Sequence, residues 1–243
     1  MARPYIGCSG FSYRHWMRGV FYPEGLSQRK WLEHYCTRFN TVELNNTFYR
    51  LPPQSNFEGW RKRTPEGFRF SVKGSRFITH IKRLQDCEDP VREFMSRVST
   101  LVEKLGVVLW QLPPGFKADR EILRQFAHLL KATGFPRHAL EFRHPSWLTS
   151  EMEAVLVDFG LGRVAADGKT CMVEEGGGGD FVYFRRHGPG GRYDVLYSED
   201  ALQEDARRAQ KWLAMGRDVY VYFNNDARGY APHNATQLLQ MIS

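Results

Sequence analysis

The sequence contains no uninterrupted apolar stretch long enough to span a bilayer, which argues against a membrane-spanning protein. Its first residues, MARPYIGCSGFSYRHW, contain no apolar run like the core of a signal peptide. The four cysteines lie at positions 8, 36, 87 and 171 and form no Cys-x-x-Cys pair, so neither a disulfide framework nor a zinc cluster is indicated. These absences predict a cytoplasmic protein with reduced thiols and no membrane partner.

Motifs that bind nucleotides or catalytic zinc are also missing. No Gly-x-Gly-x-x-Gly follows the first predicted strand and no P-loop occurs, which argues against a nucleotide-binding open sheet. No segment has the His-Glu-x-x-His spacing of helical zinc sites. We therefore predict no cofactor from the sequence motifs.

The composition is that of a basic globular protein. Of 243 residues, 42% are hydrophobic and 25% are charged, which is enough apolar material for one substantial core. The formal net charge of +7 and the pI near 9.3 favour anionic partners such as phosphorylated metabolites, nucleic acid or acidic lipid. A basic, solvated surface without any particular partner would have the same composition.

Eight short apolar runs predict buried strands. They are Tyr5–Cys8, Thr41–Leu44, Phe68–Lys73, Val107–Leu112, Ala139–Phe142, Arg163–Asp167, Phe181–Arg185 and Val219–Phe223. Helical patterns lie between most of them, and this alternation predicts parallel strands joined by right-handed crossovers. Eight such units in about 250 residues is the size of a (β/α)₈ TIM barrel. We predict one α/β barrel domain over residues 1–243, with a doubly wound open sheet as the alternative.

The helical patterns also carry end signals. They cover residues 27–39, 54–63, 88–104, 119–133, 147–159, 198–215 and 232–242. Ser27, Asp119 and Ser198 precede three of these segments and are predicted N-caps. Gly134 is predicted to end the fourth helix.

Polar side chains gather at the ends of the predicted strands. Leu140 and Phe142 share one face of their strand, while Glu141 and Arg143 share the other, because side chains alternate. TVELNN, FRFSVK, RVAAD and FVYFRRHG show the same split. If the apolar faces pack on helices, the polar faces meet on the barrel axis, where active sites of this fold lie. The predicted site comprises Glu43, Asn45, Lys73, Glu141, Arg143, His144, Asp167, Arg185, His187, Asn224 and Asn225.

Some of these residues have structural alternatives. Glu141 and Arg143 could form an ion pair that closes the barrel floor, which adds little net stability. Asn224 and Asn225 could cap a turn, and His144 could be a satisfied structural histidine.

Two kinds of loop surround the predicted mouth. The loop after the seventh strand, RRHGPGGRYDVLY, combines glycines with Arg185, Arg186 and Arg192, which favours phosphate binding. An ordinary basic surface loop would have the same composition.

Residues 9–23 and 45–53 are rich in aromatics, of which Tyr13 and Trp16 are predicted to stack on a base or sugar ring. The alternative is that these aromatics plug the mouth or cover hydrophobic surface.

Seven segments together resemble one known family: GCSGFSYRHWMRGVFYP, TVELNNTFYRLP, FSVKG, LWQLPPGF, LEFRHPSW, YFRRHGPGGRYDVLY and VYFNNDARGYAPHNA. They are similar to the YecE-like family, a prokaryotic domain of unknown function numbered 72, across essentially the whole chain. The resemblance implies a TIM barrel and no established activity or substrate. It also implies that the predicted site residues listed above, except Asp167 and Arg185, occupy motif positions of the family. Tyr193 and Tyr197 are further motif positions.

The leading functional hypothesis is an enzyme that acts on a small anionic substrate, phosphorylated or sugar-like. Glu141 would be the general acid or base, and Lys73 with Arg185 would stabilise developing negative charge. His187 or His144 would carry the second proton. The oligomeric state is not indicated.

Three alternatives are kept. A nucleic-acid-binding protein or nuclease would explain the basic charge and the aromatic loops. A non-catalytic ligand sensor would use the same polar mouth. A metal-dependent hydrolase or isomerase would bind a divalent ion through Glu43, Glu141, Asp167 and His187. The three acidic residues in that set are balanced by three basic residues at predicted strand ends, Lys73, Arg143 and Arg185. The predicted mouth is therefore neutral without a metal cation.

Overall fold

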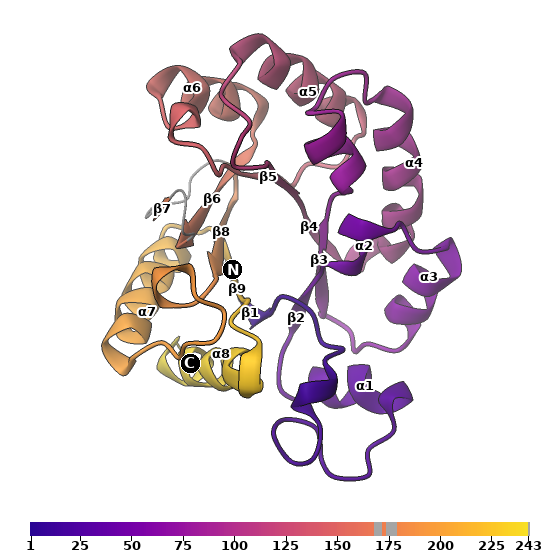
Figure 1. Cartoon of the computed structure of the whole chain (residues 1–243), viewed down its shortest axis with the longest axis vertical. Coiled ribbons are helices and arrows are strands. Elements are labelled where there is room, and N and C mark those ends of the chain that lie inside the picture. Colours follow the sequence, from indigo (N-terminus) through magenta and orange to yellow (C-terminus); the bar gives the residue numbers. More distant parts are fainter. Residues whose placement is uncertain (168–171, 174–178, 243) are drawn as a thin grey trace.

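The structure, a computed structural model, describes residues 1–167, 172–173 and 179–242. Eight parallel strands form a nearly closed barrel in the order β1-β9-β8-β6-β5-β4-β3-β2 (Figure 1). They are β1 (Pro4–Cys8), β2 (Thr41–Leu44), β3 (Arg69–Lys73), β4 (Leu105–Gln111), β5 (His138–Glu141), β6 (Gly162–Asp167), β8 (Phe181–Arg186) and β9 (Asp218–Phe223). The predicted barrel and all eight predicted strands are confirmed, with ends within two residues of the prediction.

Helices surround the strands, as Figure 1 shows. They are α1 (Trp31–Cys36), α2 (Asn46–Tyr49), α3 (Gln54–Lys62), α4 (Glu88–Val98), α5 (Arg120–Ala132), α6 (Ser150–Phe159), α7 (Glu199–Ala214) and α8 (Tyr230–Ile242). Each predicted helical segment overlaps one of them, and α8 begins two residues before the predicted 232–242. The four-residue α2 was not predicted, and neither was β7 (Met172–Val173), which pairs antiparallel with β6.

The predicted helix ends were partly right. Asp119 accepts hydrogen bonds from two backbone N–H groups of α5, and Ser198 accepts one from α7. Ser27 is a correction, because a short 3₁₀ turn follows it and its side chain makes no capping bond. The predicted helix over 88–104 also breaks, since a 3₁₀ turn containing Val102 at a φ of 51° replaces its last residues.

The barrel wall between β1 and β2 is completed by side chains. The Tyr35 hydroxyl accepts a hydrogen bond from the Cys8 N–H at 2.8 Å and donates to the Thr41 carbonyl at 3.0 Å. The Asn40 side chain makes two more hydrogen bonds to the β1 backbone, at 2.8 and 3.3 Å. These contacts satisfy backbone groups that a continuous strand ladder would otherwise pair.

Apolar side chains fill the lower part of the barrel interior. This inner cluster draws only on strands β1, β4, β5, β6, β8 and β9 and comprises Tyr5, Val107, Leu109, Ala139, Val164, Ala166, Phe181, Tyr183, Tyr220 and Tyr222. A larger cluster packs the outer strand faces against the helices. The charged strand-end residues therefore lie above a closed apolar floor.

Strand β6 departs from the predicted alternation. Val164 and Ala166 belong to the inner cluster, so Asp167 has the opposite parity and lies on the outer side of the strand. The prediction that Asp167 points to the axis was wrong. Both parities of this strand are buried, so its polarity pattern could not identify the inward face.

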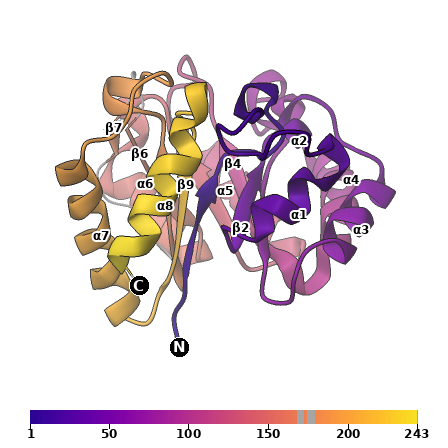
Figure 2. The same ribbon diagram turned by 90° about the horizontal axis from the view of Figure 1, so that it is seen from below.

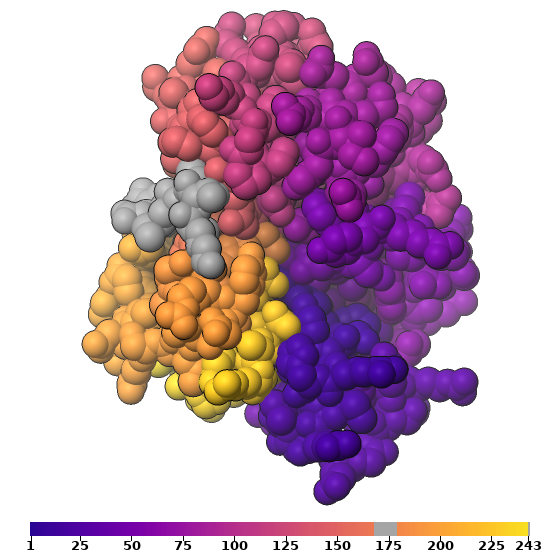
Figure 3. Space-filling view, in the orientation of Figure 1, coloured from indigo at the N-terminus to yellow at the C-terminus, as the bar shows by residue number. Residues whose placement is uncertain are grey.

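The two ends of the barrel have different roles. The amino terminus and the end of α8 lie together at the amino end (Figure 2). The opposite end carries the carboxyl ends of the strands and is the face seen in Figures 1 and 3. Figure 3 shows that this face is hollowed at its centre, between the yellow and orange segments on one side and the indigo and purple segments on the other.

Two further predictions concern the cysteines and membrane-spanning segments. Cys8, Cys36 and Cys87 are free thiols, while Cys171 lies outside the described residues. Within the described parts of the chain, no helix combines the length and the apolar character needed to cross a membrane.

Candidate active site

Arg185, at the carboxyl end of β8, is the centre of a buried ion network. Its side chain is only 1% exposed. Its Nε and Nη2 donate to the carboxylate of Glu43 at 3.0 and 2.8 Å, and its Nη1 donates to Glu141 at 2.6 Å. Both carboxylates are fully buried. The structure thus brings together three predicted residues from β2, β5 and β8 on the barrel axis.

Glu43 is also held by hydroxyl groups from two other strands. Ser9 donates to its Oε1 at 2.7 Å, and Tyr183 donates to its Oε2 at 2.6 Å. Burial alone would raise the pKa of Glu43, but Arg185 and these hydroxyls hold that pKa below its usual range. Glu43 is therefore ionised, and its oxygens are occupied. Ser9 and Tyr183 were missed by the sequence reasoning, although both lie on the inward parity of their strands.

Glu141 lies between two guanidinium groups. Arg143 forms an ion pair with its Oε1, opposite the side that contacts Arg185. Burial would raise the pKa of Glu141, but the two arginines hold it well below its usual range. A carboxylate stabilised in this way is a weak proton acceptor, and it carries no proton to donate at neutral pH.

His187 is a neutral imidazole in this arrangement. Arg143 Nη2 lies 2.7 Å from its Nε2, so Nε2 must be an acceptor. Burial lowers the pKa of His187, and Arg185 contributes in the same direction, while Glu141, whose Oε1 lies 3.5 Å from Nε2, partly opposes this shift. Asn224 contacts the other ring nitrogen at 3.1 Å, and the Tyr193 ring, 47% exposed, packs against the imidazole.

Lys73 has a different environment from the arginines. Its Nζ lies 4.1 Å from the centre of the Phe48 ring, and no described carboxylate is within 4.0 Å of it. Burial lowers the pKa of Lys73 to about 8, and the nearby Arg185 contributes in the same direction. Glu141 and Glu43 act on Lys73 in the opposite direction and raise its pKa. Lys73 is thus a cation at the mouth that forms no direct ion pair with a described carboxylate. Phe48 was not predicted as a site residue.

The mouth has an excess of positive charge. Glu43 and Glu141 supply two negative charges, while Lys73, Arg143 and Arg185 supply three positive ones. The predicted neutrality counted Asp167 among the axial acids, and Asp167 does not face the axis. The charge balance of the observed group therefore suits an anion.

Asp167 belongs to a second polar group that fixes the loop after β8. The Tyr197 hydroxyl donates to Asp167 and accepts from the Gly188 N–H at 2.7 Å. Asp167 also accepts from the His187 backbone N–H at 2.7 Å. Asn225 is fully buried and donates to the Val195 carbonyl at 3.0 Å. Asp167, Tyr197 and Asn225 thus hold the loop that carries Tyr193.

The predicted phosphate loop has no unpaired arginine. Arg185 is bound to Glu43 and Glu141, as described. Arg186 donates to Asp205 of α7 at 2.8 Å, and the exposed Arg192 lies 3.7 Å from Asp194. Because all three arginines of this loop lie beside carboxylates, their contacts do not favour phosphate binding there.

Three other predicted residues have structural contacts. Trp16 is fully buried and donates to the Asp226 carbonyl at 2.8 Å, which leaves no ring surface for a ligand. Tyr13 packs on Trp16 and donates to the Ser9 carbonyl at 2.5 Å. His144 accepts from the Ser146 N–H at 3.1 Å and caps the turn that follows. These contacts match the structural alternatives.

The four predicted metal ligands do not assemble into a metal site. Among residues 1–167, 172–173 and 179–242, no three His, Cys, Asp or Glu side chains are grouped closely enough to hold an ion. Arg185 lies between Glu43 and Glu141, where a cation would need their oxygens. The donor set therefore does not fit a divalent metal.

Four buried polar atoms at or beside the mouth have no hydrogen-bond partner among the described residues: Asn45 Oδ1, Glu141 Oε1, Arg143 Nε and Asn225 Oδ1. Of these, Glu141 Oε1 forms an ion pair with Arg143. Asn45 also lines a pocket of about 350 Å³, together with Gly10, Phe11, Ser12 and Tyr13 of the loop after β1 and with Leu44, Asn46 and Trp60. Asn45 Oδ1 is thus an available acceptor and Arg143 Nε an available donor beside the mouth.

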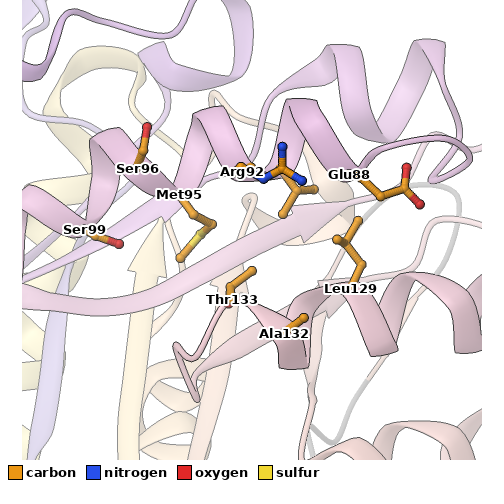
Figure 4. Close-up of a pocket in the computed structure, with 9 residues that line it drawn as sticks. Glu88, Arg92, Met95, Ser96, Ser99, Leu129, Ala132 and Thr133 are labelled. Carbon is orange, nitrogen blue, oxygen red and sulfur yellow. The ribbon is translucent and has the colours of Figure 1, made fainter.

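A separate groove of about 430 Å³ lies between α4 and α5 (Figure 4). Its lining combines Glu88 and Arg92 with the side chains of Met95, Ser96, Ser99, Leu129 and Thr133. No cluster of catalytic groups is found among these side chains. We therefore place the candidate active site at the mouth.

Comparisons with known proteins agree with the fold. YunF of Bacillus subtilis is 27% identical over 98% of this chain and 94% of its own length. YecE of Escherichia coli K12 is 34% identical over 65% of this chain and 54% of its own length. The crystal structure of a DUF72 family protein from Thermotoga maritima is 31% identical and superposes with a TM-score of 0.85 over 99% of both chains. The model of the family described as "Protein of unknown function DUF72" matches residues 5–243, so the chain belongs to the DUF72 family.

Proposed function

We propose that the chain is an enzyme that acts on a small anionic substrate, phosphorylated or sugar-like, at the carboxyl-terminal mouth of the barrel. The observation that carries this proposal is the excess positive charge of the mouth, where Lys73 has no carboxylate partner. A partly buried cation without a direct ion-pair partner is costly, and an anionic ligand would offset that cost.

The residues of the mouth divide into a support and a contact layer. Glu43, Glu141 and Arg185 satisfy one another and form the rigid support. Lys73 and the unpaired Nε of Arg143 are the groups that remain available for an anion. This division assigns binding to Lys73 and Arg143, while Glu141 positions Arg143.

The proton carrier in this proposal is His187. Its neutral imidazole contacts Arg143, so it lies beside the group that would hold the anion. A neutral imidazole accepts a proton near pH 7 more readily than a carboxylate paired with two arginines. Glu141, which the sequence favoured as the acid or base, supports the site instead.

The experiment is a titration of the purified protein with inorganic phosphate by calorimetry. Arg143→Gln should weaken phosphate binding about 10- to 100-fold, since a charge-assisted hydrogen bond contributes about 1.5–3 kcal/mol. Arg124→Gln is the matched control, because that arginine is exposed on α5. Equal phosphate affinity of both variants and the unchanged protein would remove the anion site from the mouth.

Turnover is tested by ³¹P and ¹H NMR on mixtures of phosphorylated sugars. We expect one class of compound to be converted, and His187→Gln to slow its conversion. If phosphate binds as expected and none of the compounds is converted, the mouth belongs to a sensor.

A further inference from the structure

We infer that Lys73 forms a Schiff base with the substrate, so that the anion bound at the mouth carries an aldehyde or ketone carbon. This inference rests on the proposed function and narrows its substrate class to carbonyl-containing anions, such as open-chain sugar phosphates.

The first support is the set of charges around Lys73. The two axial carboxylates, Glu43 and Glu141, are occupied by arginine, so neither forms an ion pair with the Lys73 ammonium. Arg185 and Arg143 act on Lys73 as like charges, and they and burial outweigh the opposing effect of Glu141 and Glu43. A lysine in a desolvated site beside other cations loses its proton readily and becomes nucleophilic. The lowered pKa of Lys73, about 8, agrees with this geometry.

The second support is the fixed backbone at the end of β3. The Thr47 hydroxyl donates to the Lys73 carbonyl at 2.6 Å, and the Gly74 N–H donates to the Leu109 carbonyl at 2.7 Å. A Cβ atom at position 74 would lie 2.3 Å from the Trp110 ring, so only glycine lets the chain pass there. The base of the Lys73 side chain is thus held in place, which a covalent step at its tip requires.

The third support is the aromatic face of Phe48. The ring lies 4.1 Å from the Lys73 nitrogen and covers one side of it. The same face would stabilise the positive charge of a protonated imine, as it does the ammonium. Arg143 would meanwhile hold the anionic group of the substrate.

The proposed step is balanced without any oxidant or reductant. The nitrogen lone pair of the neutral Lys73 amine attacks the carbonyl carbon, and a proton moves from nitrogen to oxygen to give a carbinolamine. Loss of the second nitrogen proton and the hydroxyl group as water forms the carbon–nitrogen double bond. Amine and carbonyl are thus converted to imine and one water.

Lys104 and Lys82 lack this combination. Lys104 donates to the Arg61 and Thr64 carbonyls at 2.7 and 2.6 Å, so its ammonium is satisfied at the protein backbone. Lys82 also lies near an aromatic ring, but 5.9 Å from the centre of Phe77. Lys82 is the matched control for the experiment.

The experiment is reductive trapping with glycolaldehyde phosphate as the probe. The full-length protein is incubated with the probe and sodium borohydride at pH 8, and adducts are located by intact mass and peptide mapping. We expect one adduct at Lys73, formed at least about tenfold faster than at Lys82, because Lys73 has no direct ion-pair partner among the described residues, lies in a desolvated site and is close to the groups that would hold the phosphate of the probe. Inorganic phosphate should slow the labelling of Lys73 but not of Lys82.

The variants Lys73→Arg and Lys82→Arg complete the test. The first should lose the fast adduct, and the second should keep it. Labelling spread evenly over exposed lysines, or no adduct at Lys73, would overturn the inference. If phosphate binding still depends on Arg143 in that case, the proposed anion site stands and only the covalent step fails.

Discussion

Single residues at the mouth depend on one another because their charges are buried together. Arg185 contacts two carboxylates that are fully removed from solvent, and Glu141 is shared between Arg185 and Arg143. Removing one partner of a buried ion pair leaves an uncompensated charge, which costs more than the pair contributes. Substitutions in this support should therefore act on stability as well as on binding.

Glu141→Gln should lower the free energy of unfolding at pH 7 by about 3–5 kcal/mol, since Arg143 and Arg185 lose a counter-charge. The pKa of Glu141 is lowered in the fold, so its stabilising contribution is complete above its ordinary pKa of 4.5 and declines as pH falls below that value. Urea unfolding at pH 7 and pH 4 should show a smaller difference from the unchanged protein at pH 4.

Glu24→Gln is the control for this prediction, because Glu24 is exposed. It should change stability little at either pH. An equal loss of stability at pH 7 and pH 4 in Glu141→Gln would show that the lost energy is packing and not charge.

Strands β1 and β2 are incompletely paired, and α1, the helix that follows β1, supplies hydrogen bonds between them. The Tyr35 hydroxyl of α1 connects Cys8 of β1 to Thr41 of β2. Tyr35→Phe would leave a buried N–H and a buried C=O without this partner, at a cost of about 1–3 kcal/mol. Amide exchange at Cys8 should become faster, and hydrogen-exchange mass spectrometry of the β1 peptide measures this. Tyr49→Phe, at an exposed tyrosine, is the control; unchanged exchange at β1 in Tyr35→Phe would mean that water replaces the hydroxyl.

Sequence reasoning predicts the elements well and their faces less well. The eight strands were found because apolar runs alternate with helical patterns over the whole chain. The inward face was correct for Glu43, Glu141 and Arg185. It was wrong for Asp167, because alternation shows that two faces differ but not which one meets the axis.

The chemistry of the site was less predictable than its location. Lys73 and His187 were identified from their positions at strand ends. Their protonation depends on which carboxylate pairs with which arginine, and that pairing is a three-dimensional fact. The Phe48 contact arises from α2, a four-residue helix too short to leave a periodic signal.

The whole molecule is basic, with a formal net charge of +7, yet the arginines of the predicted phosphate loop face carboxylates. We expect a short single-stranded oligonucleotide to bind no more tightly than about 10⁻⁴–10⁻⁶ M, the range of non-specific binding at physiological salt. Fluorescence anisotropy between 50 and 200 mM salt measures both affinity and salt slope. Nanomolar affinity with a steep slope would favour the nucleic-acid hypothesis over a small anionic substrate.

The position of the chain ends decides how this protein is best attached to a surface. Both ends lie at the base of the barrel, opposite the hollowed face (Figure 2). A tag at either end would anchor the base to a biosensor chip and leave the mouth open to a library of metabolites. Random coupling through amines would instead modify lysines, among them Lys73, the nucleophile that we propose.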